Sequence, residues 1–285
     1  MTIERILVIG AGTMGRQIAM SCALGGYSTV LQDISADALD AARAELESWA
    51  AGRVAKGKLD QSTADAALGR LGQDTDLVQG ASTADLVIEA AVERLDIKEQ
   101  IFAQLGEHAP AHAILATNSS TLPSSKVAEA SGRPEQVCNM HFFNPALVMK
   151  CVEVVRNAQT SDATIEAVTE VANRLGKNPV LVNKEIPGFI ANRMMGAINA
   201  EALNLAHAGI ASIEDIDTTA KTALGHPMGP FELMDMVGLD VIDFIAQATY
   251  AETGDAADQP HPLITEKVAA GKLGRKSGEG FYPYS

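Results

Sequence analysis

The chain has 285 residues, of which 47% are hydrophobic, and a formal net charge of -14. This length allows a large core in one or two domains, while the acidic balance argues against nucleic-acid binding, which needs basic patches. No apolar run reaches the roughly 18 residues of a membrane span, and no signal peptide is expected, so we expect no membrane partner.

The chain begins with two short apolar runs separated by a glycine-rich loop. Residues 3–9 and 28–32 are β-branched and predict strands, and residues 16–24 predict a helix that stops at Gly25-Gly26. The loop after the first strand reads GAGTMG, and Asp33 directly follows the second strand. A strand, a G-x-G-x-x-G loop, a helix, a strand and an acid within about thirty residues indicate a dinucleotide site.

Each glycine of this loop has its own physical reason. Gly10 permits the tight turn, Gly12 lets the backbone approach a pyrophosphate, and Gly15 lets the helix lie close to the sheet. Thr13 and Met14 lie between these glycines and are assigned to the same cofactor site. The alternative is a glycine-rich turn without a ligand.

The carboxylate of Asp33 decides which dinucleotide is expected. It is placed to accept hydrogen bonds from the ribose hydroxyls, and its charge repels a 2′-phosphate. NAD is therefore expected rather than NADP, with a flavin dinucleotide as the lesser option.

A basic spot lies between the next two predicted helices. Residues 37–57 and 61–71 are rich in Ala, Glu and Lys at helical spacing, and they meet at Lys56-Gly57-Lys58. These lysines either contact an anionic group of a substrate or form an ordinary solvated helix end. Spacing alone favours the helix end.

Two charged residues lie where the next strand gives way to a helix. Residues 83–91 predict a buried strand and residues 96–105 a helix, with Glu93 and Lys98 at the junction. The junction falls at the carboxyl edge of the sheet, where open α/β folds bind ligands. We expect these two residues either to pair with each other or to serve the nicotinamide half of the cofactor; a plain surface pair is the alternative.

Short polar side chains close the following strand. Residues 113–117 predict that strand, and Asn118, Ser119, Ser120 and Thr121 follow it. Hydroxyl and amide groups at this edge suit hydrogen bonds to a substrate oxygen. The competing interpretation is an N-cap for a helix over residues 124–130.

A histidine and a glutamate are carried by two adjacent predicted strands. An apolar run from residue 137 ends at His141, the chain turns at Asn144-Pro145, and a second β-branched run carries Glu153. If the strands pair, the carboxylate sets the tautomer and orientation of the imidazole, as proton-transfer enzymes require. A half-buried structural histidine and a surface glutamate are the alternative.

The pattern of alternating strands and helices stops at residue 187. We expect an α/β fold, in which residues 1–186 form a Rossmann-type domain with a mostly parallel sheet and residues 187–285 an all-helical C-terminal domain. Asn192 falls in the first turns of a long helix predicted over residues 189–207. Its amide suits a substrate carbonyl, and capping or interhelix bonding is the alternative.

Five long stretches then carry a resemblance. They read VIGAGTMG (8–15), HFFNPALVMKCVEVV (141–155), PGFIANR (187–193), PMGPFELMDMVGLD (227–240) and GKLGRKSGEGFY (271–282). Over nearly its whole length the chain resembles the short-chain L-3-hydroxyacyl-CoA dehydrogenases, most closely the bacterial 3-hydroxybutyryl-CoA dehydrogenases. These stretches are far more specific than the glycine loop alone.

The resemblance implies roles for the catalytic residues. His141 becomes the catalytic base and Glu153 its orienting partner, while Ser120 and Asn192 face the substrate oxygen. The family commonly reads Asn-Thr-Ser-Ser-Leu where this chain has Asn-Ser-Ser-Thr-Leu, so Ser119 remains the alternative to Ser120. The helical domain is implied to form a homodimer contact.

The resemblance also implies roles for the ligand-binding residues. It places Glu93 and Lys98 near the nicotinamide and Lys56 on coenzyme A, and Asn118 is counted with the cofactor residues. Ala191 stands where the family often has Val, a small change.

The expected activity is NAD-dependent interconversion of a 3-hydroxyacyl-CoA, chiefly 3-hydroxybutyryl-CoA, and the 3-ketoacyl-CoA. The alternatives are a dehydrogenase of a free hydroxy acid or sugar acid on the same scaffold, and a non-catalytic, crystallin-like relative. The three cysteines are too few and too scattered for a disulfide or zinc framework. We therefore expect no metal and a reducing, cytoplasmic compartment.

Overall fold

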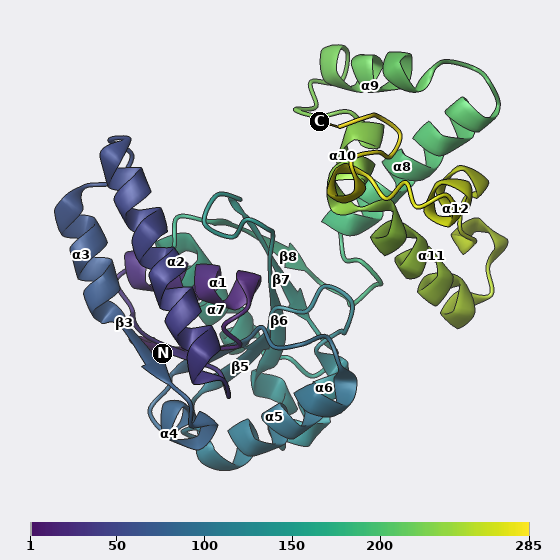
Figure 1. Cartoon of the computed structure of the whole chain (residues 1–285). Helices are drawn as coiled ribbons and strands as arrows, with labels where there is room; N and C mark the ends of the chain where they lie inside the picture. The colour runs from purple at the N-terminus through teal and green to yellow at the C-terminus, as the bar shows by residue number, and fades with distance from the viewer. Residues whose placement is uncertain (1, 285) are drawn as a thin grey trace. The chain divides into compact units, whose positions relative to one another are not determined.

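The chain forms two compact units, Met1–Ile190 and Ala191–Ser285. A computed structural model describes residues 2–284, except for the side chains of Glu252 and Ala257. Figure 1 shows the sheet in the first unit, and the second unit is helical over the residues described. The division after Ile190 lies a few residues beyond the boundary predicted at residue 187.

An eight-stranded sheet in the order β3-β2-β1-β4-β5-β6-β7-β8 forms the centre of the first unit. All neighbouring strands are parallel except β6 and β7, which are antiparallel. This confirms the predicted Rossmann-type, mostly parallel sheet. The strands are β1 (Arg5–Ile9), β2 (Ser28–Gln32), β3 (Leu71–Asp74), β4 (Leu86–Glu89), β5 (Ile114–Thr117), β6 (Val137–Phe142), β7 (Cys151–Arg156) and β8 (Asn178–Val182).

Helices cover both faces of this sheet (Figure 1). One face carries α1 (Thr13–Leu24), α2 (Ala36–Ala55), α3 (Gln61–Arg70) and α7 (Asp162–Arg174); the other carries α4 (Leu77–Ala81), α5 (Leu95–His108) and α6 (Ser125–Ala128). Along β1, Ile6 and Val8 pack on the first face, and Leu7 and Ile9 pack on the second. Strands buried on both faces explain why these runs are continuously apolar rather than alternating.

Several predicted element boundaries are wrong, including the following three. The helix predicted to reach residue 71 ends at Arg70, because Leu71 starts β3, an edge strand of sequence LGQD with no apolar alternation to reveal it. The helix predicted from residue 189 starts at Ala191, because Phe189 has a φ of 46°, which no right-handed helix contains. The strand predicted over residues 83–91 is shorter and spans Leu86–Glu89.

The second unit is helical, as predicted. Its core is formed by apolar side chains of several helices, among them Leu203, Ile216, Phe231, Met234 and Ile264. The helices are α8 (Ala191–His207), α9 (Ile213–Thr222), α10 (Pro230–Val237), α11 (Leu239–Thr253) and α12 (Pro262–Ala269). Within residues 2–284, no helix is both long enough and apolar enough to cross a membrane.

A buried aspartate of α9 joins three parts of this unit. Asp217 is 1% exposed and accepts hydrogen bonds from the backbone N–H groups of Phe231 (2.9 Å) and Glu232 (3.0 Å), in the first turn of α10. It also accepts one from the hydroxyl of Tyr282 at 2.9 Å. The carboxylate therefore caps one helix and holds the C-terminal segment.

Asp217→Ala is expected to lower the free energy of unfolding by about 2–4 kcal/mol, because it leaves buried N–H donors without an acceptor. Urea unfolding followed by circular dichroism measures the change. Glu214→Ala is the control, since Glu214 is exposed on the same helix. Equal stability of the two variants would contradict the role of Asp217.

Candidate active site

The glycine loop is built by close backbone contacts at two of its three glycines. Gly10 has a φ of 97°, and a Cβ there would lie 2.6 Å from the carbonyl oxygen of Ala90. A Cβ at Gly15 would lie 1.8 Å from the carbonyl oxygen of Gly10. Side chains at these positions are excluded by the protein itself.

Gly12 is different, because a Cβ there would meet no described atom within 4 Å. It is the N-cap of α1 and provides no side-chain hydrogen bond to the first turn, in which Thr13 and Met14 lie. The N–H groups and the dipole of this helix end suit a phosphate. The absence of a Cβ at Gly12 thus leaves room for a ligand, and the loop fits a dinucleotide.

Asp33 is held against this loop at the end of β2. Its Oδ2 accepts a hydrogen bond from the N–H of Ala11 at 2.8 Å, and its Oδ1 accepts one from Ser35 at 3.0 Å. Each carboxylate oxygen keeps a further lone pair. The orientation of the carboxylate is thus set before any ribose hydroxyl binds.

His141 and Glu153 lie directly opposite each other on the antiparallel strands β6 and β7. The Nδ1 atom of His141 is 2.8 Å from the Oε2 atom of Glu153, and the residues are 5% and 1% exposed. The contact with a carboxylate places the proton on Nδ1 and leaves Nε2 to exchange a proton with a ligand. This geometry suits an acid–base pair in which the carboxylate orients the imidazole.

Two aromatic rings and one backbone N–H group fix this pair. The ring of Phe143 lies 4.5 Å from that of His141, and the ring of Phe189 lies 5.6 Å from it. The N–H of Ile190 donates to Oε1 of Glu153 at 3.0 Å. Phe189 was missed in the sequence, and a bulky residue at positive φ is a signal that only the structure carries.

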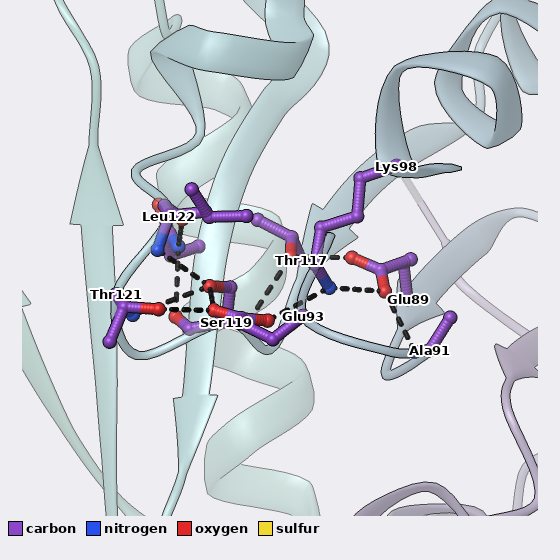
Figure 2. A network of polar contacts seen from close by, with 9 residues as sticks. Glu89, Ala91, Glu93, Lys98, Thr117, Ser119, Thr121 and Leu122 are labelled. Atoms are coloured by element: carbon purple, nitrogen blue, oxygen red, sulfur yellow. Dashed lines mark hydrogen bonds and ion pairs between the residues drawn. The ribbon is translucent and has the colours of Figure 1, made fainter. Parts of the chain in front are cut away.

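Ser119 and Ser120 have different environments. The hydroxyl of Ser119 donates to Glu93, and its oxygen accepts from the N–H of Leu122 at 2.8 Å (Figure 2). Ser120 is half-buried, and among the described residues its hydroxyl has no recorded hydrogen bond. The hydroxyl of Ser119 is therefore used within the turn, whereas the hydroxyl of Ser120 remains able to hydrogen-bond a ligand.

Asn118 links the ends of two strands. Its side-chain oxygen accepts a hydrogen bond from the N–H of Phe142 at 2.9 Å, next to His141. Since β5 and β6 are parallel, Asn118, Ser120 and His141 all follow or end strands at the same carboxyl edge of the sheet. The side-chain NH₂ of Asn118 remains able to donate to a ligand.

Glu93 and Lys98 do pair with each other, at 3.2 Å. Figure 2 shows that the pair belongs to a larger network with Glu89 and Thr117. Burial acts to raise the pKa of Glu93, but hydrogen bonds from Ser119 and Thr121 and the ammonium of Lys98 hold it below its ordinary value. Glu93 is therefore charged at neutral pH.

Glu89, the last residue of β4, was missed in the sequence. It is fully buried and lies 2.6 Å from the Nζ atom of Lys98. The one available signal was a charged residue that ends an otherwise apolar strand.

Two further predicted site residues, Lys56 and Asn192, are exposed. Lys56 is exposed at the C-terminal end of α2. Asn192 is exposed in the first turn of α8, in the second unit.

Burial raises the pKa of the Cys22 and Cys138 thiols to about 12, so neither is a nucleophile. No three His, Cys, Asp or Glu residues gather as a metal site within the described part of the chain.

Comparisons with known proteins agree with this geometry. Residues 5–186 match the family model "3-hydroxyacyl-CoA dehydrogenase, NAD binding domain", and residues 188–284 match the C-terminal domain of the same family. The probable 3-hydroxybutyryl-CoA dehydrogenase of Deinococcus radiodurans is 43% identical over 277 residues, covering 97% of this chain and 99% of the relative.

Solved structures are similar over the full length. The crystal structure of (S)-3-hydroxybutyryl-CoA dehydrogenase from Ralstonia eutropha has a TM-score of 0.93 and 39% identity and covers 100% of both chains. A diketoreductase structure has a TM-score of 0.87 and 36% identity, with the same coverage.

Proposed function

Because the chain belongs to the 3-hydroxyacyl-CoA dehydrogenase family and uses NAD, we propose that it interconverts 3-hydroxybutyryl-CoA and acetoacetyl-CoA. The hydrogen-bonded pair of His141 and Glu153, at the same sheet edge as the glycine loop, is the observation that carries this proposal. Two relatives named 3-hydroxybutyryl-CoA dehydrogenase, one similar in sequence and one with a crystal structure, support 3-hydroxybutyryl-CoA as the substrate.

In the proposed mechanism the residues of the chain move one proton. The bound cofactor supplies the hydride chemistry at C3 of the substrate. During oxidation, Nε2 of His141 takes the proton of the 3-hydroxyl group, and Glu153 stabilises the imidazolium that forms. During reduction, His141 returns the proton, while the hydroxyl of Ser120 and the amide of Asn192 donate hydrogen bonds to the C3 oxygen.

The ligand contacts of the proposal follow the predicted assignments. Gly10, Gly12 and Gly15, with Thr13 and Met14, hold the pyrophosphate, and Asp33 holds the adenosine ribose. Glu93, Lys98 and Asn118 serve the nicotinamide side. Lys56 contacts the coenzyme A part of the substrate, which its exposure permits.

We further propose a cytoplasmic homodimer whose contact is made by the helical unit. Exposed apolar side chains of that unit support a protein contact; Phe244 is 71% exposed, and Met194, Leu224, Met236 and Ile245 are also exposed.

The described cysteines are all free thiols, which suits a reducing compartment. Fatty-acid β-oxidation and butyrate metabolism are the pathways that use this reaction.

The test is nicotinamide absorbance at neutral pH with acetoacetyl-CoA, comparing NADH with NADPH and using free acetoacetate as the control substrate. We expect oxidation of NADH with the thioester only, because Asp33 repels a 2′-phosphate and the free acid lacks coenzyme A. Equal rates with NADPH would contradict the role of Asp33.

The same assay separates the second candidate function. The similarity to a diketoreductase that acts on dicarbonyl compounds supports the alternative, a dehydrogenase of free hydroxy acids or sugar acids on this scaffold. Turnover of free acetoacetate would establish that function. Binding of NADH without turnover of any of these substrates would establish the non-catalytic alternative.

A further inference from the structure

We propose that Glu89 is a positioning residue. It acts through Lys98 and Glu93, and it holds in place both the nicotinamide side of the cofactor site and the turn that carries Ser120. This inference rests on the proposed function in taking Ser120 as the substrate-facing serine. Residues 118–122 are called the serine turn below.

The carboxylate of Glu89 is buried, and both of its oxygens accept hydrogen bonds. Its Oε1 accepts hydrogen bonds from the N–H of Ala91 at 2.7 Å and from the Nζ atom of Lys98 at 2.6 Å. Its Oε2 accepts from the hydroxyl of Thr117 at 2.7 Å. Removing a carboxylate from water is costly, and the other residues of β4 are Leu86, Val87 and Ile88, so packing alone would be served by another apolar residue.

Lys98 connects Glu89 to Glu93. Its side chain is 1% exposed and presents almost no surface to a ligand, whereas the side chain of Glu93 is 42% exposed. The ammonium lies between the two carboxylates, at 2.6 Å and 3.2 Å. Lys98 therefore reaches the cofactor edge through Glu93, which it holds in one orientation (Figure 2).

Glu93 in turn holds the serine turn. Its Oε1 accepts hydrogen bonds from the hydroxyls of Ser119 and Thr121. From the other side, Thr117, which is bound to Glu89, accepts a hydrogen bond from the N–H of Ser119 at 3.2 Å. The turn is thus fixed at both ends by contacts that begin at Glu89.

Glu89→Gln removes one charge with almost no change in shape. Lys98 then has Glu93 as its one carboxylate partner in this network, and its ammonium draws that carboxylate away from the hydroxyls of Ser119 and Thr121. The serine turn loosens, and a misplacement of about 1 Å costs about 10²-fold in rate. We expect kcat to fall by about that factor, with a smaller change in KM for the thioester.

The experiment compares Glu89→Gln, Lys98→Met and the double variant with Glu99→Gln, a control with the same charge change at an exposed position of α5. Hydrogen–deuterium exchange of the Ser119, Thr121 and Leu122 amides reports on the serine turn, and kcat and KM are measured in parallel. We expect faster exchange confined to the turn in both single variants. The double variant, which lacks both buried charges, should lose no more kcat than the more impaired single variant.

Three outcomes would overturn the inference. The first is a Glu89→Gln variant whose exchange at the turn and kcat match those of Glu99→Gln. The second is a double variant whose losses multiply, which would mean that Glu89 and Lys98 act separately. The third is exchange that rises throughout the sheet, which would show a stability role rather than positioning. If the parent chain does not turn over the thioester, the proposed function fails, while exchange at the turn still tests the network.

Discussion

The His141→Ala variant is expected to lose about 10²–10⁴-fold in kcat for acetoacetyl-CoA reduction, the usual contribution of a positioned acid–base group. In the proposed mechanism the imidazole exchanges the proton, and the Glu153 carboxylate behind it is 1% exposed and cannot take its place. NADH affinity should stay at the parent value, because His141 makes no contact with the glycine loop within the described residues. Steady-state kinetics and nicotinamide fluorescence measure the two quantities.

Two controls make this result specific. His226→Ala removes an imidazole from the helical unit and should leave kcat unchanged. Thermal unfolding of His141→Ala tests whether the variant is still folded. We expect that it is, since Glu153 keeps its hydrogen bond from the N–H of Ile190. Near-normal turnover of a folded His141→Ala variant would refute the assignment.

Substitution of Gly12 and of Gly15 by alanine should separate ligand binding from loop packing. Gly15→Ala places a methyl group 1.8 Å from a backbone oxygen, so the loop must move. We expect a loss of about 1–3 kcal/mol in the free energy of unfolding, as for overpacked sites, together with loss of NADH binding. Denaturation curves and NADH titrations measure these effects.

Gly12→Ala is the matched comparison, because its methyl group meets no described atom within 4 Å. Stability should therefore stay at the parent value. NADH affinity should fall at least about tenfold, or about 1.4 kcal/mol, because the added Cβ occupies the space in which we propose that the pyrophosphate binds. A Gly12→Ala variant that binds NADH as tightly as the parent would place the pyrophosphate elsewhere.

Most of the first unit could be predicted because its signals are local. The strands β1 and β2, the glycine loop and α1 follow from apolar runs and from glycines that the backbone geometry requires. The strand β3 was missed because an edge strand needs few buried side chains and its sequence, LGQD, has almost none. The helix α9 was missed as well, although Ser212 caps it.

The residues of the candidate site could be predicted, but most of their contacts could not. The Asn144-Pro145 turn indicated that the strands of His141 and Glu153 would be neighbours, and the structure pairs the two residues directly. No pattern in the sequence indicated that Ser119 binds Glu93, twenty-six positions away. That contact exists because β4 and β5 are neighbours in the sheet.

The sequence by itself determined the fold class, the cofactor loop and the acid–base candidates, because periodicity, glycine geometry and strand ends are properties of short segments. Only the tertiary structure decided which serine hydroxyl is already used, that Lys98 is buried between two carboxylates, and that Phe189 packs against His141. These features depend on which strand ends and turns meet in space. These tertiary contacts determine which side chains are buried and which hydrogen bonds form. They join residues that are far apart in the chain, so the local sequence does not reveal them.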